Sequence, residues 1–64
     1  MAEQLLTPQQ VAEILGISMN TLKRMRLDKK GPPAVYLSAR TIRYHPDKVA
    51  EWITNNEEVT NGNH

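Results

Sequence analysis

The side chains with the most chemistry to offer in this 64-residue chain are cations, and they are concentrated in its middle. Residues 23–43 contain seven lysines and arginines and a single acid, Asp28, although the net charge of the whole chain is only +1. The other acids lie before and after this stretch. A basic segment between acidic margins is typical of a surface that meets a polyanion, and the alternative is a solvated face without a partner. The basic residues are Lys23, Arg24, Arg26, Lys29, Lys30, Arg40 and Arg43.

Few residues in this sequence could support catalysis or bind a metal ion. The absence of cysteine excludes disulfides and thiolate metal sites. His45 has only Asp47 nearby, at a spacing that a helix start also produces, and His64 lies in a polar end segment. No Ser-His-acid arrangement, metal-ligand cluster or glycine-rich phosphate loop can be assembled. We therefore expect no enzyme activity, metal, cofactor or small-molecule ligand.

The length and the first residues limit the class of protein. Sixty-four residues allow one domain at most, with a small core. The N-terminal segment MAEQLLTPQQ lacks the basic and apolar regions of a signal peptide. No apolar run approaches the roughly 20 residues that span a bilayer. We expect a cytoplasmic protein that does not bind membranes.

Two short helices are predicted to carry the first cations. Thr7 is a suitable N-cap for a helix over residues 8–15, with Pro8 and Gln10 completing a start signal and Gly16 a left-handed stop. Its expected buried face consists of Val11, Ile14 and Leu15.

Ser18 is predicted to cap a second helix that runs from Met19 to about Lys29. Gly31 and the two prolines after it should stop this helix. Its inner face is predicted to hold Leu22, Met25 and the stem of Arg26, and its outer face Asn20, Lys23, Arg24 and Leu27.

A β-hairpin and a third helix are predicted to follow. Residues 34–37 and 41–44 alternate like strands and are joined by Ser38-Ala39-Arg40. Because a two-stranded hairpin is not stable alone, Val35, Leu37 and Ile42 should pack on the helices.

The third helix should start near Pro46, after the indifferent cap His45. Its buried stripe is predicted to be Val49, Trp52 and Ile53. The polar residues 55–64 are predicted to form a disordered tail after a domain at residues 1–54.

Two short helices separated by one glycine must cross steeply, as they do in a helix-turn-helix. The register Val11, Ala12, Leu15, Gly16, Ile17, Leu22 and Met25 resembles the helix-turn-helix consensus. Residues 5–53 are similar to the MerR-like winged-helix family, and more closely resemble small phage excisionases and AlpA-type prophage regulators. The features that carry this resemblance are Leu6-Thr7, Gly31-Pro32-Pro33, Arg43-Tyr44 and Trp52.

The resemblance implies a mainly α fold with a small β-hairpin, a winged helix-turn-helix. Two departures from the family pattern stand out. Met25 occupies a position that is commonly tryptophan in relatives, which alters core packing. His45-Pro46 replaces a basic pair after the tyrosine, which removes possible phosphate contacts near the wing.

The resemblance also implies that the second helix reads the major groove of double-stranded DNA. Asn20 suits adenine and Arg24 suits guanine, while Thr21 or Lys23 can reach phosphate or base edges. Alternatively, Asn20 could support the N-terminus of its own helix. Lys23 and Arg24 could be ordinary surface charges.

The hairpin is expected to supply the second set of contacts. Arg40 at its tip should reach the neighbouring minor groove or its phosphates, and Arg43 is a second wing contact. Four further residues are possible phosphate contacts: Ser18, Arg26, Lys29 and Lys30.

Three of these residues have specific alternatives. For Arg26, a salt bridge with Asp28 or Glu13 competes evenly with phosphate binding. Lys29 and Lys30 are expected to offer general attraction rather than specific contacts. Tyr36 is interpreted as a half-buried strand residue, with a phosphate contact as the alternative, and Trp52 as part of the core.

Three functions remain as hypotheses. The first is an excisionase, a recombination directionality factor that bends DNA beside an attachment site and works with an integrase. The second is a small AlpA-type transcriptional regulator, and the third is a protein-interaction module. Full MerR regulators dimerise through a long helix, whereas only about eleven polar residues follow Ile53 here. We therefore favour a factor whose copies assemble side by side on DNA, since one monomer makes few phosphate contacts.

Overall fold

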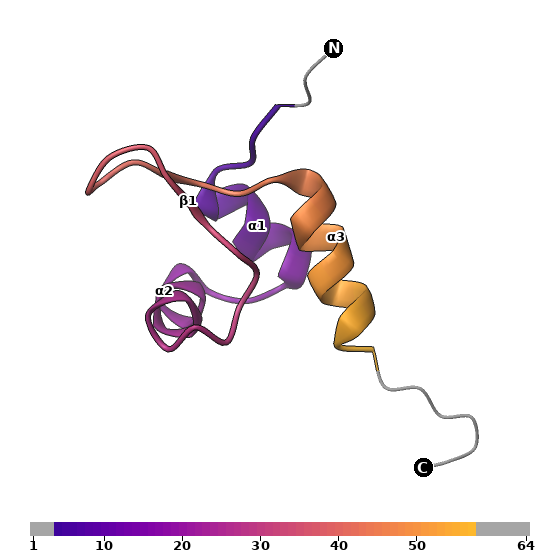
Figure 1. Cartoon of the computed structure of the whole chain (residues 1–64). Helices are drawn as coiled ribbons and strands as arrows, with labels where there is room; N and C mark the ends of the chain where they lie inside the picture. Colours follow the sequence, from indigo (N-terminus) through magenta and orange to yellow (C-terminus); the bar gives the residue numbers. More distant parts are fainter. Residues whose placement is uncertain (1–3, 58–64) are drawn as a thin grey trace, which may run out of the picture.

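Three helices and one short hairpin make up the fold, in the order helix, helix, hairpin, helix (Figure 1). The computed structural model describes residues 4–57. This is the predicted winged helix-turn-helix, mainly α, and the hairpin with its loop forms the wing. In Figure 1 the first helix lies in the middle, with the second helix, the wing and the third helix around it. The elements are α1 (Pro8–Leu15), α2 (Met19–Leu27), β1 (Val35–Tyr36), β2 (Ile42–Arg43) and α3 (Pro46–Asn55).

Capping residues bound α1 as the sequence predicts. The Thr7 hydroxyl accepts a hydrogen bond from the Gln10 N–H at 3.1 Å, and the Gln10 side chain accepts one from the Thr7 N–H at 2.9 Å. This reciprocal pair satisfies two N–H groups that would otherwise lack partners. At the other end Gly16 is left-handed, with φ of 71°. The chain then turns directly into α2, as a helix-turn-helix requires.

The end of α2 differs from the prediction, because the helix stops at Leu27 rather than near Lys29. Lys29 is left-handed, with φ of 59°, and the Lys30 N–H donates to the Met25 carbonyl at 2.8 Å. This hydrogen bond closes the helix in the way that is usual for a glycine in the left-handed position. A lysine gives no such stop signal in a sequence, whereas Gly31 does, and the sequence therefore predicts a later end.

The wing is shorter than predicted, with only two residue pairs: Val35 with Arg43, and Tyr36 with Ile42. Beyond it, Leu6 and Tyr44 form an isolated antiparallel bridge. The Leu6 N–H donates to the Tyr44 carbonyl at 2.7 Å, and the Tyr44 N–H donates to the Leu6 carbonyl at 2.9 Å. The segment that leads into α1 is therefore joined to the exit of the wing.

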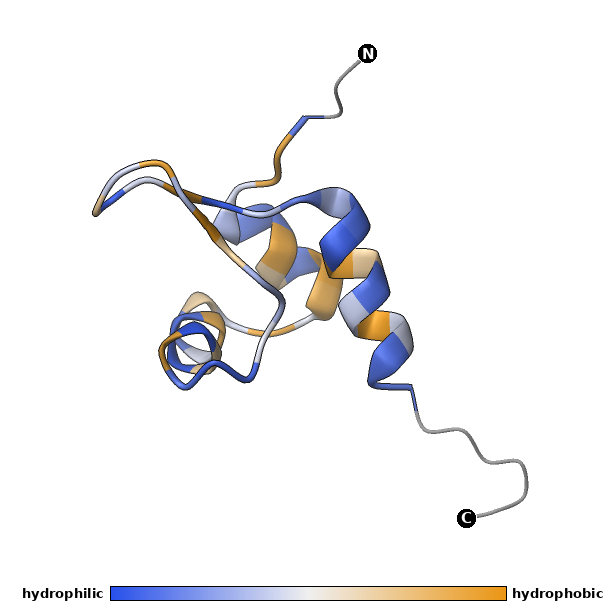
Figure 2. Ribbon diagram, in the orientation of Figure 1, coloured by the Kyte–Doolittle hydropathy of each residue, from blue (hydrophilic) through white to orange (hydrophobic). Residues whose placement is uncertain are grey.

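Five buried residues form the core, and they come from the three helices and the segment between β2 and α3. They are Val11, Ala12, Leu22, Tyr44 and Val49. Figure 2 shows the hydrophobic residues of α1 in the middle of the molecule. The Tyr44 side chain is only 1% exposed, and burial raises the pKa of its hydroxyl, an effect that the charge of Arg26 partly opposes.

Three predictions about packing are wrong. Ile14 is 55% exposed, because Ala12 rather than Ile14 completes the buried face of α1. Leu37 is 59% exposed, since it lies beyond the last strand pair. Trp52 is half-buried and outside the core, where Val49 and Ile53 carry the packing of α3. Most of the predicted tail, residues 58–64, lies outside the described residues, and the domain boundary at residue 54 stays a prediction.

Replacing Lys29 by glycine should raise the free energy of unfolding by about 0.5–1 kcal/mol. Glycine removes about 1–2 kcal/mol of left-handed strain and costs about 0.5–1 kcal/mol of chain entropy. Urea unfolding followed by circular dichroism measures the change. Lys30→Gly is the matched control, because it removes an equal charge at a residue without positive φ. A Lys29→Gly protein no more stable than the Lys30→Gly protein would contradict the assignment.

Candidate nucleic-acid interface

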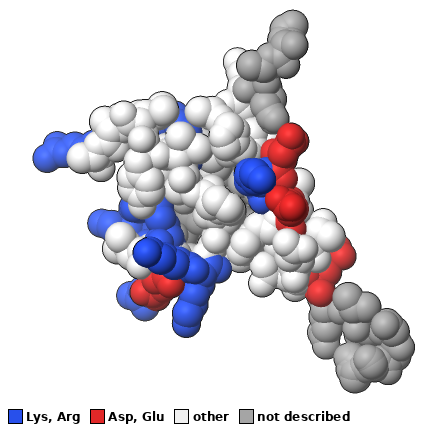
Figure 3. Space-filling model, viewed as in Figure 1, with Lys and Arg blue, Asp and Glu red and all other residues white. Residues whose placement is uncertain are grey.

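The basic side chains gather at one end of the molecule. Figure 3 shows Lys and Arg over α2 and at the tip of the wing, whereas Asp and Glu lie mainly along α3. Within residues 4–57, the one ion pair is between Lys48 and Glu51 on α3, at 3.8 Å. The cations of α2 and the wing are therefore not neutralised by any acid that the structure describes.

Helix geometry places four exposed side chains on the outer face of α2. Leu22 is buried on the opposite side of this helix, at 2% exposure. With 100° between successive residues, the side chains most nearly opposite Leu22 are those 2 and 5 positions onward and 2 positions back. The outer face therefore centres on Asn20, Arg24 and Leu27, with Lys23 at its edge, 100° around the helix from Leu22. All four residues predicted for this face are exposed. Together with Asp28 they line one shallow cleft.

The hydroxyl groups at the start of α2 are engaged with each other. The Ser18 hydroxyl accepts a hydrogen bond from the Thr21 N–H at 3.1 Å and donates to the Thr21 hydroxyl oxygen at 2.9 Å. Ser18 is therefore the N-cap of α2, and its own proton is committed. Thr21 keeps its hydroxyl proton for another acceptor.

Arg26 contacts the wing rather than an acid. Its Nη1 donates to the Tyr36 hydroxyl at 2.7 Å, and its guanidinium carbon lies 5.6 Å from the centre of the Tyr36 ring. The suggested salt bridge with Asp28 or Glu13 is absent among residues 4–57. Residues two apart on a helix point to opposite sides, which explains why Asp28 does not reach Arg26.

Tyr36 itself differs from its sequence interpretation, because it is 55% exposed rather than half-buried. Its ring lies against the guanidinium instead of the core. No sequence spacing predicts the Arg26–Tyr36 contact, since the two residues are ten apart and belong to different elements. The contact fixes β1 against α2.

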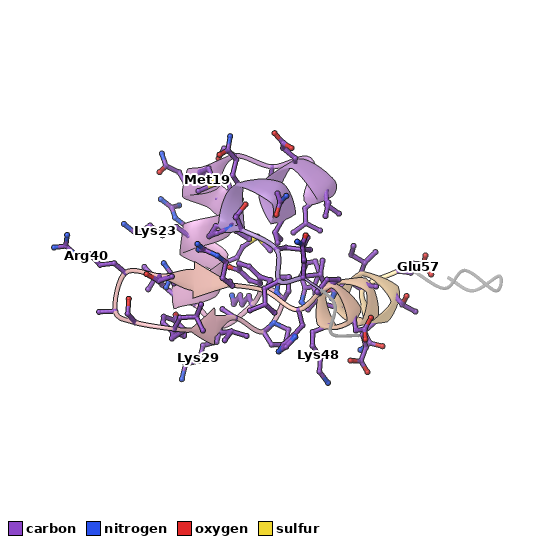
Figure 4. All side chains as sticks on the ribbon, turned by 90° about the horizontal axis from the view of Figure 1, so that it is seen from above. Met19, Lys23, Lys29, Arg40, Lys48 and Glu57 are labelled. Atoms are coloured by element: carbon purple, nitrogen blue, oxygen red, sulfur yellow. The ribbon has the colours of Figure 1, made fainter. Side chains whose placement is uncertain are left out.

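The wing presents one free cation at its tip and one that is folded back. Ser38 closes the loop: its side-chain oxygen accepts hydrogen bonds from the N–H groups of Arg40 and Thr41. The exposed Arg40 side chain extends from the outer end of the wing (Figure 4). By contrast, Arg43 is partly buried and donates to the Ile42 carbonyl at 2.8 Å.

A groove separates α2 from the wing. It has a volume of about 350 Å³, and its walls come from α2, β2 and the start of α1. Two cations, Lys23 and Arg26, line it beside the apolar side chains of Met19 and Ile42. Figure 4 shows Lys23, Met19 and Arg40 toward one end of the molecule, and Lys48 and Glu57 toward the other. Lys29 and Lys30, also exposed, follow the end of α2.

The described part of the chain contains no group of three or more His, Asp or Glu residues placed to hold a metal ion. None of the helices formed by residues 4–57 is long and apolar enough to cross a membrane. The basic end of the molecule is formed by α2 and the tip of the wing (Figure 3).

Residues 5–57 match a family model described as a helix-turn-helix domain. This match covers α1, α2, the wing and α3, so it includes every element described above. No curated protein matches the chain.

The Arg26–Tyr36 contact should appear as a coupling energy in solution. A double-mutant cycle of Arg26→Met and Tyr36→Phe is expected to give about 0.5–1 kcal/mol, the range for exposed contacts of this kind. The exposed Lys48–Glu51 pair, with Lys48→Met and Glu51→Gln, provides a reference cycle of about 0.3 kcal/mol. Strictly additive effects of Arg26→Met and Tyr36→Phe would show that α2 and the wing are not joined in this way.

Proposed function

Because the chain belongs to the helix-turn-helix domain family, which binds DNA at specific sequences, we propose that it is a phage or prophage excisionase. Such a protein is a recombination directionality factor that binds and bends DNA near an attachment site. The observation that carries the proposal is the basic end formed by α2 and the wing, whose cations have no acidic partner among residues 4–57.

The outer face of α2 is suited to the major groove, which admits an α-helix. In the proposed complex Asn20 pairs with adenine and Arg24 with guanine, each through two hydrogen bonds. Thr21 and Lys23 contact phosphates or base edges. These side chains are exposed and form no ion pair with any of residues 4–57. Their hydrogen-bonding groups are therefore available to DNA.

The wing tip is suited to the neighbouring minor groove. Arg40 projects beyond the strand pairs, and narrow minor grooves attract arginine. The DNA strand between the two grooves would pass over the groove that Lys23 and Arg26 line. Lys29 and Lys30 add general attraction, Arg43 contacts the backbone beside the wing, and Ser18 offers the N-terminal end of α2.

Assembly of several copies is part of the proposal. One domain of this size contacts about four to six phosphates, which gives weak binding at physiological salt. Copies bound side by side on repeated sites reach useful occupancy and deform a longer stretch of DNA. An integrase is then the proposed protein partner, recruited to the same DNA. The alternative function that the resemblance suggests is a small AlpA-type transcriptional regulator, which would bind at a promoter instead of an attachment site.

A gel-shift titration on tiled fragments of the element that encodes the chain tests the proposal, with competitor DNA present. A ladder of cooperative shifts on repeated sites beside an attachment core is the expected result. A single shift at a promoter would favour the regulator. If no fragment shifted specifically at low or moderate salt, the DNA-binding proposal itself would be refuted.

Arg24→Ala and Arg40→Ala should weaken DNA binding in different ways. Arg24→Ala is expected to cost about 1–3 kcal/mol on the specific site and little on random DNA, because it removes base contacts. Arg40→Ala should weaken binding to all sequences and lower the slope of log K against log salt by about 1. Both are measured by fluorescence anisotropy over a range of salt concentrations.

Lys48→Ala provides the matched control for these two variants. It also removes one cation, but from α3, away from the basic end (Figure 4). We expect its affinity for specific and random DNA to stay within a factor of two of the unmodified protein. Equal losses on both DNAs for Arg24→Ala would contradict its assignment to a base.

A further inference from the structure

Leu27 is the most exposed of the large hydrophobic residues that the structure describes, with 62% of its side chain accessible to solvent. A single exposed leucine on a protein surface has no meaning by itself. The position of Leu27 distinguishes it from Ile14 on α1, which is 55% exposed. Leu27 lies on the outer face of α2, among the side chains proposed to read DNA.

Helix geometry makes Leu27 continuous with those side chains. It follows Lys23 by four residues and Arg24 by three, so all three project from neighbouring turns of one face. Leu27 lines the same shallow cleft as Asn20, Lys23 and Arg24. Asp28, the C-cap of α2, completes the border, so the cleft is lined by two cations, one acid, one amide and one apolar side chain.

The side chains that line the cleft indicate which kind of partner could bind there. The cations favour a polyanion over an apolar peptide, so the partner that charge complementarity supports is DNA. In the major groove each base pair presents donors and acceptors, and the apolar group is the 5-methyl of thymine. A leucine side chain offers no hydrogen bond and can contribute only by removing such a group from water.

We propose that Leu27 contacts the 5-methyl group of a thymine and makes the chain specific for that base. The inference rests on the proposed function, because it needs α2 in the major groove. The helix rise places Leu27 about 4.5 Å beyond Arg24 along the axis of α2. Successive base pairs are about 3.4 Å apart, so the thymine should lie one or two base steps from the guanine that Arg24 reads.

Replacement of thymine by deoxyuridine tests the proposal, because it removes the methyl group and leaves every hydrogen-bonding group in place. A binding site is first selected from duplexes with a random central segment. Each thymine of the selected site is then replaced singly, and affinity is measured by fluorescence anisotropy. One replacement, one or two steps from the Arg24 guanine, should weaken binding about fourfold, the loss expected for one buried methyl group.

Leu27→Ala identifies the side chain responsible. This variant should bind the thymine site more weakly and should show the same affinity, within a factor of 1.5 or so, for the thymine and deoxyuridine duplexes. Ile14→Ala is the matched control: it shortens an exposed aliphatic residue of similar size on α1 and should keep the fourfold response. Circular dichroism establishes that both variants are folded.

The outcomes separate this inference from the proposed function. Enrichment of a defined site with no response to any deoxyuridine would overturn the role of Leu27 and leave specific DNA binding intact. A response that Leu27→Ala retains would also overturn it, since another side chain would then contact the methyl. Failure to enrich any sequence would refute both proposals.

Discussion

The pairing of Leu6 with Tyr44 holds the two ends of the fold together. Two backbone hydrogen bonds join Leu6, the residue before the Thr7 cap, to Tyr44, the residue before the His45 cap of α3, and Tyr44 belongs to the buried core. Tyr44 belongs to the same buried cluster as residues from α1, α2 and α3. The wing has only two residue pairs of its own, so its place depends on this bridge at its base. Together with the Arg26–Tyr36 contact, this bridge sets where the wing, and with it Arg40, lies relative to α2.

Local signals in the sequence were sufficient for most of the helical framework. Capping residues and Gly16 act over three or four residues, so Thr7, Gln10 and Ser18 predict the helix starts without knowledge of the rest. Contacts between distant parts of the chain were harder to predict from the sequence. Strand alternation predicts that Leu37 packs on the helices, but the residue lies beyond the last strand pair. Helical spacing with Val49 and Ile53 predicts that Trp52 is buried, but spacing does not show how far the core extends toward it. The central position of Tyr44 depends on a pairing with a residue nearly forty positions away, which periodicity does not report.

The candidate interface shows the same difference between local features, which the sequence predicts, and tertiary contacts, which it does not. The outer face of α2 follows from helix periodicity alone, and the four residues predicted to share it do so. The partner of Arg26 could not be predicted, since Tyr36 comes from another element and the nearby acids looked more suitable. The sequence predicts that Ser18 caps α2, but it does not show that the Ser18 hydroxyl also donates its proton to the Thr21 hydroxyl. The roles of individual residues toward DNA rest on chemistry and on the family, and remain predictions.

The small size of the wing has a mechanical consequence. A hairpin held by two residue pairs, one bridge at its base and one solvent-exposed contact to α2 behaves as a compliant arm rather than a rigid prong. Such an arm adjusts to minor grooves of different width at small elastic cost, and it exerts little force on them. Rigidity resides instead in the capped helices, which cross at a glycine and share a core. Discrimination between DNA sequences should then fall to the stiff half of the molecule, while the arm contributes tolerance for the varied curvature of the DNA it holds.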